Sequence, residues 1–174
     1  MAKSTPVLVG MGLVGLLLYQ SSIATARTEV AKGDRIEVGK SLPLRLLPVV
    51  ARSEDPLLSC ATAFVVSPSC GVCRALAERL AAAPGAVPQP LLLSLADHAT
   101  TLAFSKSTGV PRLFRFRPPR GGRMIDVPGY LDIHAVPTRL LFDARAEVVD
   151  IRLTSELPAA AEAPQGCPAP TQLD

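Results

Sequence analysis

Short apolar runs alternate along this chain with stretches in which apolar residues recur at helical spacing. The runs at residues 61–66 and 89–96 predict strands that are buried on both faces. Between them a helix is predicted to begin near Cys70 and to end at the Pro84-Gly85 pair, which stops helical structure. One face of that helix carries Cys73, Leu76, Ala77 and Leu80.

The second half of the chain predicts a further helix at residues 97–107, ended by Gly109, and a hairpin of two strands. The hairpin strands are expected at residues 139–142 and 147–153. This order of strands and helices predicts a mixed α/β sheet with flanking helices. Three segments lack a regular pattern: 42–50 as an irregular or edge strand, 111–122 as irregular and basic, and 124–133 as loop with a short strand.

The N-terminal segment has no charged residue between Lys3 and Arg27. The small residues Ala24-Thr25-Ala26 fit a cleavage site and therefore a removable signal peptide. The alternative is an uncleaved single-pass anchor, since the whole uncharged stretch reaches the roughly 20 residues that span a bilayer. We expect the anchor, because a charged spacer follows it, and both interpretations export the domain. The predicted divisions are an anchor or signal peptide (1–26), a spacer (27–41), the domain (42–156) and a Pro/Ala-rich tail (157–174).

The composition narrows the classes of protein to which this chain can belong. Hydrophobic residues make up 48% of the 174 residues and charged residues 19%, which supports a packed core and argues against disorder. A net charge of +3 is too small to indicate nucleic-acid binding. Four cysteines are too few for a scaffold built from disulfides. The question is what one CxxC pair and two isolated cysteines do.

Cys70 and Cys73 form the CxxC pair, placed after a buried strand and at the start of a helix. The dipole and free N–H groups at a helix N-terminus stabilise a thiolate, so Cys70 is the expected attacking group and Cys73 the resolving thiol. Haem attachment would need His where Arg74 stands. Zinc would need two more ligands, and His98 and His134 are far apart in sequence. Redox chemistry is favoured over a structural disulfide, and no metal or other cofactor is expected.

Three segments resemble known proteins. Residues 64–74 look like the active-site strand and helix of thioredoxin-like proteins, and their Ser-Pro-x-Cys-x-x-Cys pattern is similar to the methylamine-utilisation accessory thioredoxin family. Residues 38–43 resemble the Gly-x-x-x-Pro start of membrane-anchored, periplasmic thioredoxin-like domains. Residues 135–143 resemble their cis-proline loop and following strand. The likeness covers about residues 36–155.

The resemblance implies a thioredoxin-like fold with a cis peptide before Pro137, facing the sulfur of Cys70. It also implies that the backbone at Val136 pairs with a bound substrate peptide. The implied activity is thiol–disulfide exchange with cysteines of a client protein in the periplasm, in maturation of a redox enzyme and with a redox partner in the inner membrane. Ser69 departs from the usual Trp, the buried acid of thioredoxins has no clear counterpart, and an insertion is implied within 111–130.

Two other functions stay open. The reduced cysteine pair, with His134, suits a Cu(I) metallochaperone, because thiolates favour that ion. A redox-silent scaffold subunit of a membrane complex is the other alternative. His134 is otherwise interpreted as an ordinary surface residue.

Two further features have a functional and a structural interpretation. Cys60 and Cys167 either form a second disulfide that ties the tail to the domain or are unrelated thiols. A basic cluster either contacts an acidic partner or anionic lipid, or is an edge strand whose charges prevent aggregation, which we favour. The cluster consists of Arg112, Arg115, Arg117, Arg120 and Arg123.

Overall fold

The computed structural model describes residues 35–42, 46–49, 58–83, 85–87, 90–118, 122–124, 127–157 and 166–167. The predicted anchor at 1–26 and the first part of the spacer therefore lie outside the described residues, as does most of the predicted tail. Within the described ranges, each helix is too short or too polar to cross a bilayer. The predicted domain boundaries stay predictions.

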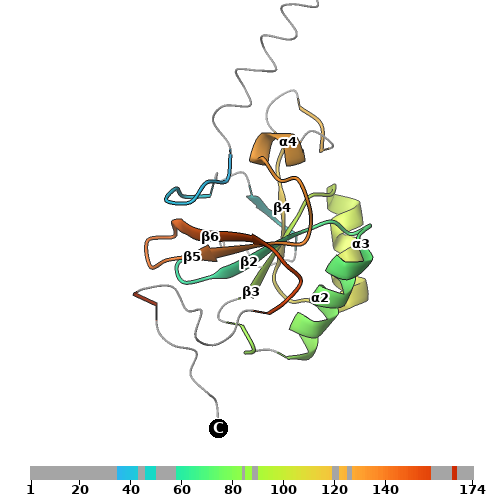
Figure 1. Ribbon diagram of the computed structural model, residues 1–174. Helices are drawn as coiled ribbons and strands as arrows, with labels where there is room; N and C mark the ends of the chain where they lie inside the picture. Colours follow the sequence, from blue (N-terminus) through green and yellow to red (C-terminus); the bar gives the residue numbers. More distant parts are fainter. Residues whose placement is uncertain are drawn as a thin grey trace, which may run out of the picture. The chain divides into compact units, whose positions relative to one another are not determined.

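Six strands form one mixed sheet in the order β1-β4-β3-β2-β5-β6 (Figure 1). Strands β2, β3 and β4 run parallel to one another, whereas β1 pairs with β4, β5 with β2, and β6 with β5 in antiparallel fashion. The strands are β1 (Leu46–Pro48), β2 (Thr62–Val66), β3 (Pro90–Ser94), β4 (Leu113–Phe116), β5 (Thr138–Phe142) and β6 (Val148–Leu153).

The central strands are where the apolar runs predicted them. Every residue of β2 is buried, as expected for a strand that is covered on both faces. In the register of the sheet, Phe64 of β2 lies between Leu92 of β3 and Arg139 of β5. The predicted hairpin is also confirmed: β5 and β6 are joined by a turn and pair in antiparallel fashion. Their pairing has one register shift, between Leu141 and Phe142.

Two of the three described helices confirm the sequence predictions. Helix α2 (Gly71–Ala82) and helix α3 (His98–Thr108) pack side by side on one face of the sheet (Figure 1). Asp97 caps the start of α3 by accepting from the Thr100 N–H, and Gly109 ends the helix at φ 71°. Glycine adopts that left-handed conformation without steric cost. The short helix α4 (Val127–Leu131) contributes to the core of the opposite face.

The prediction for residues 111–133 was wrong in two places. The segment taken as irregular contains β4, which lies between β1 and β3 and buries Phe114 and Phe116. Arg115, the member of the arginine cluster that lies in β4, is therefore not on an edge strand, and Arg120 lies outside the described residues. The segment taken as loop contains α4, in which Pro128 stands in the first turn, where proline is tolerated. Both elements depend on distant chain segments rather than on local periodicity.

Two apolar clusters occupy the two faces of the sheet. One contains Phe64, Val66 and Leu92 together with buried residues of α2 and α3. The other contains Ala63, Val65 and the buried residues of α4. Val136 packs against both clusters, because it lies just before β5 at the end of the sheet where β2 runs into α2. The fold thus brings the loop before β5 to the start of α2.

Candidate active site

Cys70 is the N-cap residue of α2, one short turn after the end of β2. Its backbone N–H donates to the Ser67 carbonyl at 3.0 Å, which closes that turn. Cys70 has an extended backbone (φ −89°, ψ 116°), and its Sγ accepts from the Cys73 N–H at 3.2 Å. An N-cap side chain normally satisfies a free helical N–H in this way. The backbone N–H of Cys73, in the first turn of the helix, therefore donates to the Cys70 sulfur.

The two thiols of the CxxC pair differ in exposure, and neither is disulfide-bonded in this structure. Cys70 is partly exposed, whereas Cys73 is fully buried within the apolar cluster of α2. Burial raises the pKa of the Cys73 thiol to about 12, and the neighbouring Cys70 sulfur adds to that rise. Cys73 consequently keeps its proton at neutral pH, and Cys70 is the sulfur that a partner molecule can reach.

The loop before β5 lies against Cys70. The Val136–Pro137 peptide bond is cis, as the resemblance implied. The Val136 carbonyl oxygen lies 3.9 Å from the Cys70 Sγ, although the two residues are 66 positions apart. The Thr138 hydroxyl donates to the Ala135 carbonyl at 2.7 Å and so supports the loop from its other end. The structure thus brings together the four residues predicted for the site.

In the part of the chain that the structure describes, Cys73 has apolar neighbours and no buried acid of the kind that thioredoxins carry. Phe64 and Leu76 share the apolar cluster with Cys73. Among the residues that the structure describes, the buried polar and charged side chains include no carboxylate: they are Thr62, Ser94, Thr101, Ser105, Thr108, Thr138 and Arg139. An acid that assists proton transfer to Cys73 therefore does not come from the buried part of the described chain.

A cleft of about 420 Å³ adjoins the cis-proline loop, and sequence reasoning did not find it. Ser67 and Val136, whose carbonyl groups both lie next to Cys70, are among the residues that line it. His134 also lines the cleft, but 86% of its side chain is exposed and its Nε2 lies 3.2 Å from Asp132. The other lining residues are Leu95, Ala96, Asp97, Met124, Pro128, Ile133 and Ala135. Met124, Pro128 and Ile133 belong to the segment 111–133, whose structure the sequence did not predict, so nothing in the sequence indicated that they meet the β3–α3 connection at one cleft.

The copper interpretation of the sequence combined His134 with the two thiols. His134 does not come together with the cysteine pair as a cluster, since the described residues contain no group of three or more His, Cys, Asp or Glu side chains placed to hold a metal ion.

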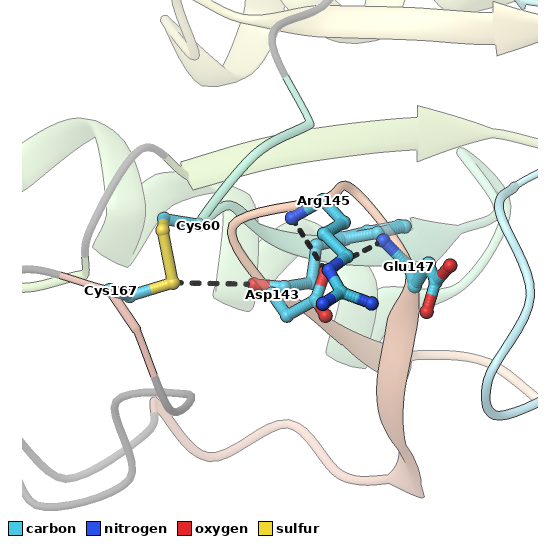
Figure 2. Close-up of a disulfide and its surroundings, with 6 residues drawn as sticks. Cys60, Asp143, Arg145, Glu147 and Cys167 are labelled. Atoms are coloured by element: carbon cyan, nitrogen blue, oxygen red, sulfur yellow. Dashed lines mark hydrogen bonds between the residues drawn. A yellow bond between two sulfur atoms is a disulfide. The ribbon is translucent and has the colours of Figure 1, made fainter.

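Cys60 and Cys167 are joined by a disulfide, the first of the two interpretations that the sequence left open (Figure 2). Their Cα atoms lie 5.4 Å apart and 107 positions apart in sequence. The bridge lies beside the β5–β6 turn, where the Asp143 carboxylate accepts from the backbone N–H groups of Arg145 and Glu147. The disulfide precedes β2, whereas Cys70 follows it, so the two sulfur sites lie at opposite ends of that strand.

The segment after β6 is also held at two points before it leaves the described residues. The Arg79 guanidinium of α2 donates to the Ser155 carbonyl at 2.6 Å. Leu157 packs against the apolar cluster between α2 and the sheet. Together with Cys167, these contacts attach the C-terminal segment to the domain at three places.

No family model matches this chain, and no curated protein matches it. Solved structures do match. A domain of a possible thiol-disulfide isomerase from Cytophaga hutchinsonii is 15% identical with a TM-score of 0.50, and the match covers 70% of this chain and 87% of that one. A thiol-disulfide isomerase from Corynebacterium glutamicum is 13% identical with a TM-score of 0.50, covering 69% of this chain and 87% of that one. The mixed sheet, the flanking helices and these likenesses show that the chain has a thioredoxin-like fold, as the resemblance implied.

Proposed function

We propose that this chain is a thiol–disulfide oxidoreductase that exchanges disulfides with cysteines of a client protein. The observation that carries the proposal is the position of Cys70. Its sulfur is partly exposed at a helix N-terminus and lies 3.9 Å from the Val136 carbonyl beside cis-Pro137, with the Cys73 thiol one turn further along. The names of the similar solved structures support the same activity.

The reduced protein would act on a client disulfide in two steps. The Cys70 thiolate attacks one client sulfur, forms a mixed disulfide and releases the other client sulfur as a thiolate. Cys73 then gives up its proton, attacks the Cys70 sulfur and forms the Cys70–Cys73 disulfide, which releases the second client thiol. Two electrons pass to the client, and a donor dithiol must return them. The reverse sequence would oxidise a client.

The high pKa of Cys73 orders these two steps. While both thiols are free, burial and the adjacent Cys70 sulfur keep Cys73 protonated. Once Cys70 is bonded to a client, its sulfur carries no charge, so part of the rise in the Cys73 pKa is removed. Cys73 therefore becomes a better nucleophile only when there is a mixed disulfide to resolve.

We further propose that the domain works in the periplasm and is anchored in the inner membrane through residues 1–26, close in role to the methylamine-utilisation accessory thioredoxins. The support is the uncharged N-terminal stretch and the Ser-Pro-x-Cys-x-x-Cys pattern at 67–73. The client would then be a redox enzyme during maturation, and the electron donor a membrane protein. Fractionation tests the anchor: the full chain should stay with membranes in alkaline carbonate, and a chain that begins at Arg27 should be released.

The reduction potential of the Cys70–Cys73 pair tests the activity. The protein is equilibrated in glutathione or dithiothreitol buffers, and the two thiols are counted by alkylation and mass spectrometry, with Cys70→Ser as the control. A potential of about −270 mV would indicate a reductant, and one of about −120 mV an oxidant or isomerase. A pair that never forms its disulfide at any poise would refute the proposal. The copper or scaffold function would then be favoured.

A further inference from the structure

Strand β6 forms one edge of the sheet, and its outer backbone groups are open over its second half. The Thr154 N–H donates to the Pro137 carbonyl, so the backbone of Thr154 faces β5. Because backbone groups alternate in direction along a strand, those of Leu153 and Ile151 face away from the sheet. Among the described residues, no backbone group bonds to either of them from outside the sheet. This part of the edge can therefore accept a further strand.

The rest of the sheet's edges is protected. At the start of β6, the Val148 N–H donates to the Lys40 carbonyl at 2.9 Å, and the Gly39 N–H donates to the Val148 carbonyl at 2.7 Å. At the opposite edge, β1 has three residues and ends at Pro48, which has no N–H to offer a further strand. The open backbone is thus confined to the second half of β6.

The open half of β6 also exposes apolar side chains. Val149, Ile151 and Leu153 are 40%, 37% and 65% exposed, and they are three of the five large apolar side chains that the described chain exposes. Sheet edges that resist association carry lysine, proline or a bulge that twists them away. A second strand at this edge would cover both the unpaired backbone groups and part of this apolar surface.

The charges of β6 make the strand complementary to itself. The Arg152 Nε lies 3.0 Å from the Asp150 carboxylate, so both charges lie on one face of the strand. In an antiparallel pair of two β6 strands centred on Ile151, each Asp150 lies opposite the Arg152 of the second copy. The same register places each Val149 opposite a Leu153 and lets the two Ile151 residues exchange both of their outward backbone hydrogen bonds.

Other registers of this pair are unfavourable. A shift of two residues places Arg152 opposite Arg152, or Asp150 opposite Asp150, and like charges directly opposite destabilise a sheet. A shift of one residue places a charged side chain opposite an apolar one and directs the backbone groups of one strand away from the other. The sequence of this edge therefore favours one symmetric pairing.

We infer that the second half of β6 pairs with the same segment of a second copy of this chain and forms a symmetric dimer. The inference goes beyond the proposed function and does not depend on it. Since β2 and β6 both run antiparallel to β5, Cys70 follows the end of β2, two strands away from the junction. The thiol sites would stay open, at opposite ends of one continuous sheet. The short junction makes the dimer weak, with a dissociation constant in the micromolar range.

The first test is a crosslink that depends on the register. The purified full chain carries Cys70→Ser and Cys73→Ser, so that the thiols of the proposed active site take no part, and Ile151→Cys is added. Opposite Cα atoms at this position would lie about 5.5 Å apart, within the range of about 4.4–6.8 Å that a disulfide spans. Oxidation by Cu(II)-phenanthroline in air should therefore give a covalent dimer on a non-reducing gel.

Leu153→Cys in the same background is the matched control. Leu153 is more exposed than Ile151, so random collisions would crosslink it faster. In the symmetric register, however, the two copies of Leu153 lie four residues apart along the strands, or about 13 Å. Ile151→Cys should consequently form the covalent dimer at least about tenfold faster than Leu153→Cys.

The second test weakens the dimer without a crosslink. Ile151→Lys places two lysines opposite each other and should raise the dissociation constant at least about tenfold in sedimentation equilibrium of the full chain in a non-denaturing detergent. Arg152→Glu, which places like charges opposite each other, should raise it by about tenfold. Val72→Lys, at an exposed position on α2, is the matched control and should leave it unchanged. Leu153→Lys replaces Ile151→Lys if circular dichroism shows that the latter fails to fold.

Faster crosslinking at position 151 than at position 153, together with a dimer that Ile151→Lys weakens and Val72→Lys does not, supports the inference. A full chain that stays monomeric into the high micromolar range would overturn it and leave the edge to a strand from a client or from the chain's own tail. Crosslinking at Leu153→Cys that is as fast as at Ile151→Cys would also overturn it. So would a dimer that persists in Ile151→Lys, because that dimer is held elsewhere. The proposed function is unaffected by any of these results.

Discussion

Replacement of both Cys60 and Cys167 by Ala would show how much of the domain's stability depends on the second disulfide. The bridge closes a loop whose ends are 107 positions apart in sequence. In the chain-entropy account, a crosslink over ~100 residues lowers the freedom of the unfolded chain by about 4.7 kcal/mol. Measured values for disulfides are typically about 2–4 kcal/mol, so we expect a loss of about 3–5 kcal/mol.

Other effects of the double substitution should be small. Both cysteines are only half-buried, so little apolar contact is lost. Cys60 has a left-handed backbone (φ 57°), and Ala meets the same steric cost there, which leaves backbone strain unchanged. The expected loss is a large share of the ~5–15 kcal/mol by which most domains are stable. The change in the free energy of unfolding therefore reports the contribution of the crosslink, with little contribution from packing.

Urea denaturation followed by circular dichroism measures the loss, because the chain has no Trp for fluorescence. The proteins compared should both carry Cys70→Ser and Cys73→Ser, so that only one disulfide contributes. The single variant Cys60→Ala should lose as much as the double variant, since either substitution removes the same bond. A loss below about 1 kcal/mol would refute the entropic reasoning and show that the tail adds little to the folded state.

Four further predictions each concern a single residue. In a Cys70→Ala variant, the rate at which iodoacetamide alkylates Cys73 should still rise at about pH 10, because burial is the largest cause of its raised pKa; a plateau near pH 9 would contradict this. With both thiols free, the free energy of unfolding should fall as pH rises from 9.0 toward about 12, since the unfolded chain releases the Cys73 proton first; a flat profile would be inconsistent with that pKa. Arg79→Ala should lower the free energy of unfolding by about 0.5–1 kcal/mol through loss of the bond to the Ser155 carbonyl, with Cys70 alkylation unchanged as the control. Asp97→Ala should lower the melting temperature more at about pH 6 than at about pH 3, because hydrogen bonds from Thr100 lower the Asp97 pKa and their benefit is lost as the carboxylate is protonated; an equal effect at both would speak against the cap.

Local sequence patterns predicted the parts of the fold that depend on residues close in sequence. The apolar run that became β2 is buried at every position, and the periodic face of α2 is buried at Cys73, Leu76 and Leu80. The cap of α3 at Asp97 is likewise a local interaction. Since burial periodicity and capping act over a few residues, both could be predicted without a structure.

Contacts between distant residues decided the rest. β4 exists because β1 and β3 pair with its two edges. The arginines in and around this segment led to its prediction as irregular and basic, so Phe114 and Phe116 were not recognised as core residues. The pairing of two strands, unlike the periodicity of one, cannot be predicted from the sequence of a single segment.

The sequence by itself determined the chemistry of this protein. The spacing of Cys70 and Cys73 is covalent, and the helix that starts there follows from the residues nearby in sequence. Only the tertiary structure decided what surrounds that chemistry. It placed Val136 against the Cys70 sulfur, joined Cys60 to Cys167, and formed the apolar cleft from three chain segments. The physical reason is that covalent spacing sets which groups can react, whereas packing over many tens of residues sets which partners can reach them.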